Sequence, residues 1–433
     1  MKLLTSLYKQ KNIRRISALL ILAALIFSTA CGGPTSAKPV IPEPDPIPDP
    51  VYADLSMRFF GDLMTHDAQI KAAKQDDGTY DFSDYFKYTG KYAAEADWAV
   101  INLETTLPCT GVYSGYPAFR APEILANNIA DAGFNMCFTS NNHMNDSGLK
   151  GARTTLEVLH NVGLATAGSR IDPETEPRTT IVDVEFTDES GEVNSVKVGF
   201  VAYTYETGII NGRRCINGIQ LNDEQLACYN SYLSYNGDEM LNQSLEEIKK
   251  EIEYSQANAD ITIVYMHWGE EYYLKANAQQ LYVSKYLAEL KPDAIVGSHS
   301  HTVQPITEID GVPVFYSLGN YISNQRQETL SGFHPNAHYT EQFIIGCLDF
   351  RLVKEFDEAG NPMPWKLESV KASAIPGWID KYTAGGKVHY AAIPLTDGFE
   401  ETEELKTRGH TQRAKSALED IKKIVGEDYL RLE

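Results

Sequence analysis

Residues 293–301 read DAIVGSHSH, a short apolar run that ends in glycine, serine and two histidines. The run has the length of a strand, and a helix-length amphipathic segment over 278–290 precedes it. Neighbouring imidazoles directly after a strand are a common way of presenting metal ligands. The stretch therefore predicts a strand of an α/β fold with His299 and His301 at its carboxyl end.

The same arrangement recurs along the rest of the chain, where apolar runs of strand length alternate with amphipathic segments. Further strands are expected at 55–62, 97–104, 134–140, 196–203, 261–269 and 312–320. Further helices are expected at 122–132, 149–162 and 239–256. Alternation of this kind is typical of α/β architecture.

Polar side chains follow the ends of these runs. They are Asp62, Glu104, Asn142, His143 and His267, in addition to the two histidines of the opening stretch. Ligands of open α/β sheets bind beyond the carboxyl ends of the strands, so we expect these residues to converge on one rim. The chain has ten histidines, and half of them, including His66, fall in or next to these clusters.

Each residue taken singly also has a purely structural interpretation. Asp62 after a glycine is typical of a turn or a helix cap. A lone His267 is more often a packed, hydrogen-bonded core residue than a ligand. Only the ordered combination favours a site, and a relic without metal predicts histidines that are dispersed or paired with carboxylates rather than convergent.

The combination reads, in chain order, GD, NLE, SNNH, HWG, GSHSH and SLGN. It resembles the CapA family, also called the poly-γ-glutamate capsule biosynthesis or PGA-cap domain, from about Met57 to Ile322 and on through Pro394. CapA domains are similar to divergent calcineurin-like metallophosphoesterases. The resemblance implies an α/β four-layer sandwich, in which two mixed β-sheets pack face to face and are flanked by helices.

The resemblance also implies a site for two divalent metal ions. The implied ligands are Asp62 and His301 for the first ion, Glu104 as the bridge, and Asn142, His267 and His299 for the second. His143 is implied as the electrophile and general acid over the leaving group, not as a ligand. Carboxylate, amide and imidazole ligands suit manganese, iron, zinc or magnesium. Two such ions about 3.5–4 Å apart clamp a phosphoryl group and activate a bound water.

Two positions depart from the superfamily pattern. Met64 stands where phosphoesterases of this superfamily have a ligand histidine, and a thioether is a poor ligand for hard divalent ions. His66 is near enough to substitute if the loop turns back. The bridging residue Glu104 is one methylene longer than the usual aspartate. These departures weaken the expectation of phosphomonoesterase activity more than that of metal binding.

Three further polar residues are weaker candidates. Glu271 either orients a ligand histidine through a hydrogen bond or is solvated. Asn320 ends the last strand and is a candidate for the same rim. Arg120 either recognises a substrate carboxylate or phosphate or forms a surface salt bridge.

The N-terminal segment has the features of a targeting sequence and not those of a folded domain. A basic segment and the apolar run 18–27 precede Ser28-Thr29-Ala30-Cys31, which resembles a bacterial lipoprotein cleavage site. The alternative is an ordinary signal peptide. The prolines from Pro39 to Pro50 indicate a semi-rigid spacer. We expect a signal peptide with a lipidated Cys31 over 1–31, a tether over 32–51, the core over 52–330, and strands and a helix completing the same domain over 331–433.

The formal net charge of −21 disfavours nucleic acid as a partner and anionic surfaces in general, unless metal ions reverse the local sign. The resemblance implies work on an anionic capsule polymer or its precursor at the extracytoplasmic face of a bacterial cell membrane, beside membrane-bound synthase or exporter subunits. Two functions stay open. One is a metal-dependent hydrolase, which the Asn142-His143 pair favours. The other is a non-catalytic, metal-containing scaffold or polymer-binding accessory, which Met64 favours.

Overall fold

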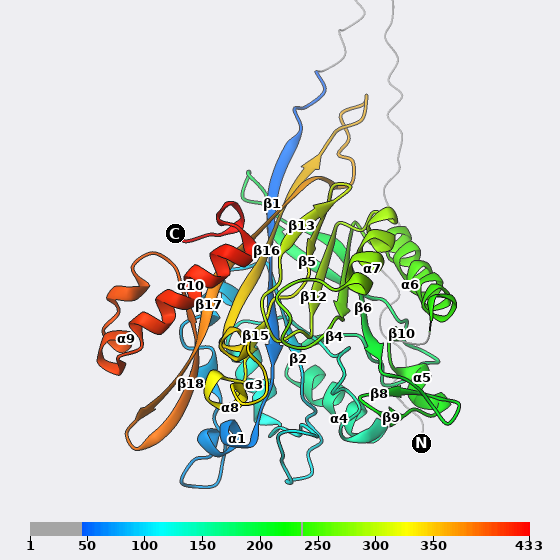
Figure 1. Cartoon of the computed structure of the whole chain (residues 1–433). Helices are drawn as coiled ribbons and strands as arrows, with labels where there is room; N and C mark the ends of the chain where they lie inside the picture. The colour runs from blue at the N-terminus through cyan, green and yellow to red at the C-terminus, as the bar shows by residue number, and fades with distance from the viewer. Residues whose placement is uncertain (1–45, 235–236) are drawn as a thin grey trace, which may run out of the picture. The chain divides into compact units, whose positions relative to one another are not determined.

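The computed structural model describes residues 46–234 and 237–433 (Figure 1). The expected signal peptide, Cys31 and most of the expected tether lie outside the described residues. Strand β1 (Val51–Leu63) begins directly after the last proline of the spacer. No helix within the described ranges is long and apolar enough to cross a membrane.

The first sheet is built around β1, which pairs antiparallel with β16 and parallel with β2 and β15. The strand order is β18 (Lys387–Pro394), β17 (Lys366–Ala384), β16 (Gln342–Lys354), β1, β2 (Trp98–Leu103), β3 (Met136–Phe138) and β4 (Ala165–Ala167), with β15 (Asn320–Ile322) beside the end of β1. The strands after β1 in this order are parallel to it, whereas β16, β17 and β18 form an antiparallel meander, so the sheet is mixed.

The second sheet is also mixed. Its order is β10 (Ser231–Leu233), β6 (Val193–Glu206), β11 (Ile261–His267), β12 (Ala294–Ser298), β14 (Val312–Phe315) and β13 (Ile306–Ile309), with β5 (Thr180–Thr187) paired to β6. The four strands from β6 to β14 are parallel to one another, and β5 and β13 run antiparallel to their neighbours. The parallel strands read as continuous apolar runs because both of their faces are buried.

The two sheets pack face to face. Leu55, Met57 and Phe59 of β1 share one core with Val198 and Phe200 of β6. The alternate residues of each sheet point to the opposite face, where helices cover them. The helices are α1 (Asp67–Ala73), α2 (Gly90–Ala94), α3 (Ile124–Asp131) and α4 (Gly148–Asn161) on the first sheet, and α6 (Asp238–Asn258) and α7 (Ala278–Glu289) on the second. The expected four-layer α/β sandwich of two mixed sheets is confirmed.

Helix α6 shows why these segments are helical and where they pack. Leu245, Ile248 and Ile252 recur at spacings of three and four residues, and all three are fully buried against the second sheet. Burying such a side chain stabilises the fold by about 1.5–3 kcal/mol. Helix α7 begins at a cap in which the Asn277 side chain accepts from the backbone N–H of Gln280.

The remaining elements lie at the edges of the sandwich. Helix α10 (Thr411–Val425) packs its apolar face into the core shared by the two sheets. A small third sheet, which the sequence did not indicate, covers 208–220. The other elements are α5 (Asp223–Cys228), α8 (Gln327–Leu330), α9 (Glu403–Arg408), β7 (Gly208–Ile210), β8 (Arg213–Ile216), β9 (Ile219–Gln220), and the 3₁₀ turns Ser83–Tyr85, Ala337–Glu341, Phe399–Glu401 and Glu427–Tyr429.

The prediction of a single strand over 312–320 was wrong. Strand β14 ends at Phe315 in the second sheet, and β15 begins at Asn320 in the first. Gly319 between them has a φ of +76°, which an extended strand does not adopt. The segment therefore carries the chain from one sheet to the other, beside the end of β1.

Candidate metal centre

The strand ends that carry the candidate ligands come from both sheets. From the first sheet come Asp62 near the end of β1, Glu104 after β2, and Asn142 and His143 after β3; from the second come His267 at the end of β11 and His299 and His301 after β12. The expected rim is therefore a meeting point between two sheets, and no single sheet supplies all of it.

Gly61 allows the end of β1, and with it Asp62, to lie directly against the segment around Gly319. A Cβ at position 61 would lie 1.9 Å from the carbonyl oxygen of Gly319, so any other residue would push the two segments apart. The backbone N–H of Asp62 donates to that same carbonyl at 3.0 Å. The register of β1 against β2 shifts between Phe60 and Asp62. Such an irregularity re-aims the side chain that follows it.

The two histidines after β12 are held in an unusual backbone conformation. His299 has a φ of 100° and His301 a φ of 55°. Backbone of this kind costs about 1–3 kcal/mol per residue and persists only where the surroundings hold it. Asp62 does so here, because its Oδ2 lies 3.1 Å from Nδ1 of His301 and 3.4 Å from the backbone nitrogen of His299. Strain of this kind is typical of functional sites.

Two overlapping sets of candidate ligand atoms converge. Glu104, His267 and His299 form one set, and Asp62, Glu104 and His301 form the other. Within each set the ligand atoms lie within 4.8 Å of one another. All five residues are at most 2% exposed. The histidines are therefore convergent, and Glu104, which belongs to both sets, lies where a bridging carboxylate would have to be.

Buried atoms without partners indicate that this donor set fits a cation. Among the described residues, Oε1 of Glu104 and Nδ1 of His299 have no hydrogen-bond partner. Oε1 of Glu104 lies 3.7 Å from Nε2 of His267 and 3.8 Å from Nε2 of His301. An unsatisfied buried polar atom costs about 1–3 kcal/mol. A divalent ion bound by these atoms would remove that cost.

The asparagines of the SNNH motif complete this part of the site. Oδ1 of Asn142 lies 2.9 Å from Nε2 of His267, so its amide oxygen lies next to the set that contains Glu104, His267 and His299. Asn141 has a supporting role, because its Nδ2 donates to Oδ1 of Asn102 and to the carbonyl of Leu103. Asn102 in turn donates to Oδ1 of Asp62 at 2.8 Å.

The pKa values of the two carboxyls diverge. Burial raises the pKa of Glu104 well above its ordinary value, and the neighbouring charge of Asp62 adds to this effect. Burial also acts to raise the pKa of Asp62, but the hydrogen bond and charge of His301 outweigh it and hold that pKa below its ordinary value. In the metal-free protein one carboxyl thus tends to keep its proton and the other is ionised.

The histidine pKa values diverge in the same way. Burial and the charge of His301 lower the pKa of His299 to about 4. Burial, with the charge of His299, lowers the pKa of His267 well below its ordinary value. Burial lowers the pKa of His301 too, yet Asp62 raises it by more. Two of the three imidazoles are therefore neutral near pH 7, the form that binds metals.

His143 forms a buried pair with Asp146, a residue that the sequence reasoning missed. Nδ1 of His143 lies 2.7 Å from Oδ2 of Asp146, three residues further along the same turn. The backbone N–H of Phe119 also donates to Oδ2 of Asp146, and the Phe119 ring packs edge-on against the imidazole at 4.6 Å. The carboxylate fixes the ring and directs Nε2 away from Asp146. The sequence signal was an aspartate at i+3 in NNHMND.

Met64 and His66 do not supply a further ligand in this structure. Met64 is buried, and its sulfur accepts from Oγ of Ser323 at 3.8 Å. His66 caps helix α1, with Nδ1 3.1 Å from Oε1 of Gln69. It belongs to neither ligand set. Burial lowers its pKa to about 4 despite the bond to Gln69.

The three weaker candidates lie around the centre. Asn320 is fully buried and close enough to His301 for a hydrogen bond that raises the pKa of that histidine. Glu271 lies at the rim with part of its surface exposed. Partial burial acts to raise its pKa, but the nearby charges of His301 and His299 outweigh this effect and lower the pKa. Arg120 donates to the backbone carbonyl of Asp146 at 3.3 Å and forms no ion pair with any described carboxylate.

Comparison with known proteins matches these observations. The family described as "Bacterial capsule synthesis protein PGA_cap" matches residues 56–325. The chain belongs to this family. This confirms the family expected from the motifs, and the matched segment contains every residue of both ligand sets and the His143–Asp146 pair.

This PGA_cap chain is similar to two capsule biosynthesis proteins of Bacillus species. The "PGA biosynthesis protein CapA" of Bacillus subtilis (strain 168) is 26% identical over 345 residues, which are 75% of this chain and 78% of the relative. The "Capsule biosynthesis protein CapA" of Bacillus anthracis is 25% identical over 325 residues, covering 73% and 70%. Among solved structures, the chain is similar to the calcineurin-like phosphoesterase YfkN from Bacillus subtilis, with 15% identity, a TM-score of 0.41, and coverage of 84% of this chain and 99% of that chain.

Proposed function

We propose that this PGA_cap chain is a CapA-type protein of capsule polymer synthesis or export, with a metal-dependent, hydrolase-like centre that acts on an anionic envelope polymer or its precursor. Poly-γ-glutamate is the polymer that the family and the relatives favour. The observation that carries the proposal is the convergence of five buried candidate ligands from two sheets. Two of these residues, Glu104 and His299, have a ligand atom without a hydrogen-bond partner.

The residues divide into ligands and a proton donor. Asp62 and His301 would hold one divalent ion, Asn142, His267 and His299 another, with Glu104 shared. Manganese, iron, zinc or magnesium ions suit these ligands, and when bound they polarise the scissile bond and lower the pKa of a bound water.

His143 supplies what the ligands do not. Its Nδ1 is bonded to Asp146, so Nε2 is the atom that can give a proton to the leaving oxygen or nitrogen. Asp146 acts through His143, because it holds the imidazole in one orientation. Burial of the pair keeps bulk water from competing for that proton.

The proposal includes work at the membrane, which the N-terminal sequence supports. A lipid on Cys31 would anchor the protein on the extracytoplasmic face, and the proline-rich spacer would hold the sandwich away from the bilayer. Membrane-bound synthase or exporter subunits are the partners proposed for it there. Support for this part comes from the sequence of the first fifty residues and from the family.

The test combines metal content with hydrolysis. The full chain, purified in mild detergent, is analysed for bound metal and assayed with manganese on a generic phosphodiester and on γ-linked polyglutamate. His143→Ala should keep the metal and lose about 10²–10⁴-fold in rate, the usual contribution of a general acid. His299→Ala should lose both metal and hydrolysis. His338→Ala, a histidine with a half-exposed side chain outside both ligand sets, is the matched control and should change neither.

A specific observation favours a second candidate, the non-catalytic scaffold. The position of the missing ligand histidine is filled by Met64, whose sulfur faces Ser323, and the nearby His66 is used as a helix cap. The first ion would then have fewer protein ligands. Metal binding without cleavage of either substrate would select this function, and a chain that binds no metal at all would refute both.

A further inference from the structure

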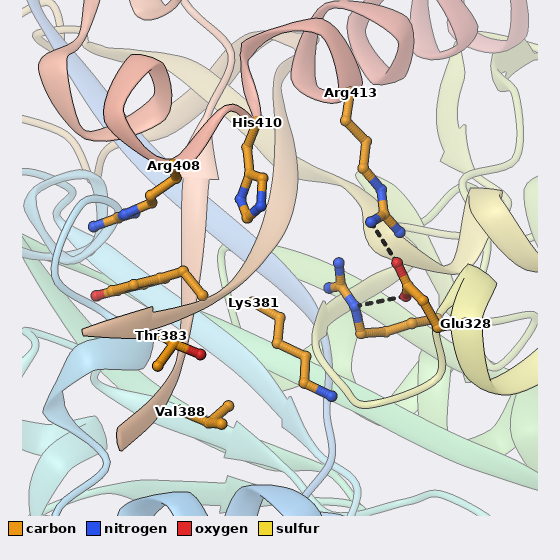
Figure 2. A pocket seen from close by; sticks show the side chains of 9 residues that line it. Glu328, Lys381, Thr383, Val388, Arg408, His410 and Arg413 are labelled. Carbon is orange, nitrogen blue, oxygen red and sulfur yellow. Dashed lines mark hydrogen bonds and ion pairs between the residues drawn. The ribbon is translucent and has the colours of Figure 1, made fainter. Parts of the chain in front are cut away.

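A cavity of about 420 Å³ lies outside the metal centre, where α8, β17, β18 and the junction of α9 and α10 meet (Figure 2). Basic side chains from several elements line it. We call this group the cationic pocket, and its members are Arg326, Lys381, Arg408, His410 and Arg413. A concentration of positive charge is unusual on a chain whose formal net charge is −21.

Two of the guanidinium groups share a pair of carboxylates. Arg326 is 2% exposed and lies 3.2 Å from Oε2 of Glu341, which is itself 1% exposed. Its Nε lies 3.4 Å from Glu328. Arg413 reaches both Glu328 and Glu341 from helix α10, and Figure 2 shows its contact with Glu328. These four side chains form a closed network.

The third guanidinium is balanced in the same way. Arg408 lies 2.7 Å from Oδ2 of Asp380, and Nδ1 of His410 lies 2.6 Å from Oδ1 of the same carboxylate. Asp380 is fully buried. The guanidinium also covers the ring of Tyr382, 3.4 Å from its centroid. The three arginines are therefore neutralised by three carboxylates before any ligand arrives.

Lys381 is different, because it forms no ion pair with any carboxylate that the structure describes. Its Nζ donates to Oδ1 of Asn324 at 3.2 Å and lies 5.3 Å from the centroid of the Tyr390 ring. Partial burial lowers the pKa of Lys381, and so does the positive charge of Arg326, because the fold holds the two cations near each other. An anion bound beside Lys381 would relieve that repulsion.

We propose that the cationic pocket binds a carboxylate group of an anionic chain, with Lys381 as its counter-ion. The charge balance selects the ligand class. With the arginines already paired, Lys381 offers one positive charge that no described carboxylate pairs, and a bound carboxylate matches this charge whereas a phosphate dianion exceeds it. Thr383 of β17 and Val388 of β18 also line the pocket (Figure 2).

A short segment connects the cationic pocket to the metal centre. Asn324, the acceptor of the Lys381 hydrogen bond, donates its backbone N–H to Nδ1 of His66 at 3.3 Å. The next residue, Gln325, accepts from Asn320, which lies beside His301. That the ligand is an anionic polymer rests on the proposed function, since a polymer processed at the metal centre has further carboxylates that need a binding site. The binding of a carboxylate does not depend on that function.

The experiment measures binding instead of turnover. A fluorescein-labelled γ-linked glutamate hexamer is titrated with the full chain, and fluorescence anisotropy gives the Kd. Lys381→Gln should weaken binding by about tenfold or more, because it removes a charge-assisted hydrogen bond. Lys381→Arg should retain most of the affinity. The matched control is Lys371→Gln, an exposed lysine on the same strand without an ion pair to a described carboxylate, which should change the Kd less than twofold. Thermal melting verifies that each variant is folded.

Competition and a metal-centre variant separate the possible results. Free glutarate should displace the hexamer at lower concentration than inorganic phosphate, and the reverse order would overturn the assignment to carboxylate. His299→Ala, measured without metal, should bind the hexamer as the parent chain does. If that variant loses binding, the hexamer sits at the metal centre and the pocket proposal fails. Equal Kd values for Lys381→Gln and Lys371→Gln would also overturn it, whatever the metal content.

Discussion

The metal centre and the cationic pocket are both built from charged side chains, but they satisfy those charges in opposite ways. In the cationic pocket each guanidinium already has a carboxylate, and one lysine is left over. In the metal centre Oε1 of Glu104 and Nδ1 of His299 are buried without hydrogen-bond partners. The charges of the pocket are therefore balanced before it binds anything, and breaking one of its pairs should be costly, whereas the centre carries an electrostatic cost that a bound cation would remove.

The largest effect is expected where a paired charge is removed from the pocket. Arg326→Met leaves the buried Glu341 with fewer partners and should lower the free energy of unfolding by about 3–5 kcal/mol. Arg351→Met is the matched control, because Arg351 pairs only with exposed carboxylates and its loss should cost far less. Urea unfolding of both variants measures the difference. Similar losses would mean that the buried network does not stabilise the fold.

Metal should have the next largest effect, and it should act through the other region. Manganese at about 100 times its Kd should stabilise the native state by about 2.7 kcal/mol. A chelator should reverse the gain, and His299→Ala should show none of it. Lys381→Gln should respond to manganese like the parent chain, and thermal melting in both conditions measures this. A metal response in His299→Ala would contradict the ligand assignment.

Replacing the shared carboxyl of the metal centre should have the opposite sign to removing a charge from the pocket. Glu104→Gln should raise the stability of the metal-free protein by about 1 kcal/mol at neutral pH. The folded-state pKa of Glu104 is raised, so stability is fully present below the ordinary value of 4.5 and is lost as pH rises towards the folded-state pKa. The variant should lack this loss. Urea titrations from pH 4 to 8 without metal test the prediction, and a destabilised variant would contradict it.

The smallest effect concerns an exposed charge at the edge of the pocket. The bond to Arg413 lowers the pKa of Glu328 to about 2 although burial acts to raise it. The stability it contributes is present above pH 4.5 and is lost as pH falls towards about 2. Glu328→Gln should cost about 0.5–1 kcal/mol near pH 7, since solvent screens the pair, and its cost should vanish at low pH. An unchanged cost in acid would rule out the ion pair as its source.

Much of the sandwich could be predicted because its central strands are buried on both faces. The runs that contain β1, β2, β6, β11 and β12 stand out as apolar against their surroundings, and the helices between them show regular spacing. The run over 312–320 was predicted as one strand, although the structure has two strands there in different sheets. The passage from one sheet to the other depends on the hydrogen bond between Gly319 and Asp62, which lie far apart in the sequence.

The candidate ligands could be found because each directly ends or follows a strand. Asp146 was missed because its role depends on a turn that brings it back to His143, and no periodic pattern records a turn of that kind. The cationic pocket was missed for a different reason. Arg326, Lys381 and Arg413 come from three separate elements, and charged residues scattered in a sequence look like an ordinary solvated surface.

The division of the ligands between two sheets also limits when the metal centre can exist. Neither sheet alone presents a complete set, so the centre forms only after the sandwich has closed and Gly61 has met Gly319. A partly folded chain would offer no such centre to an ion. If the chain is exported before it folds, the composition of ions outside the cytoplasm, and not the pool in which the chain was synthesised, decides which metal it carries.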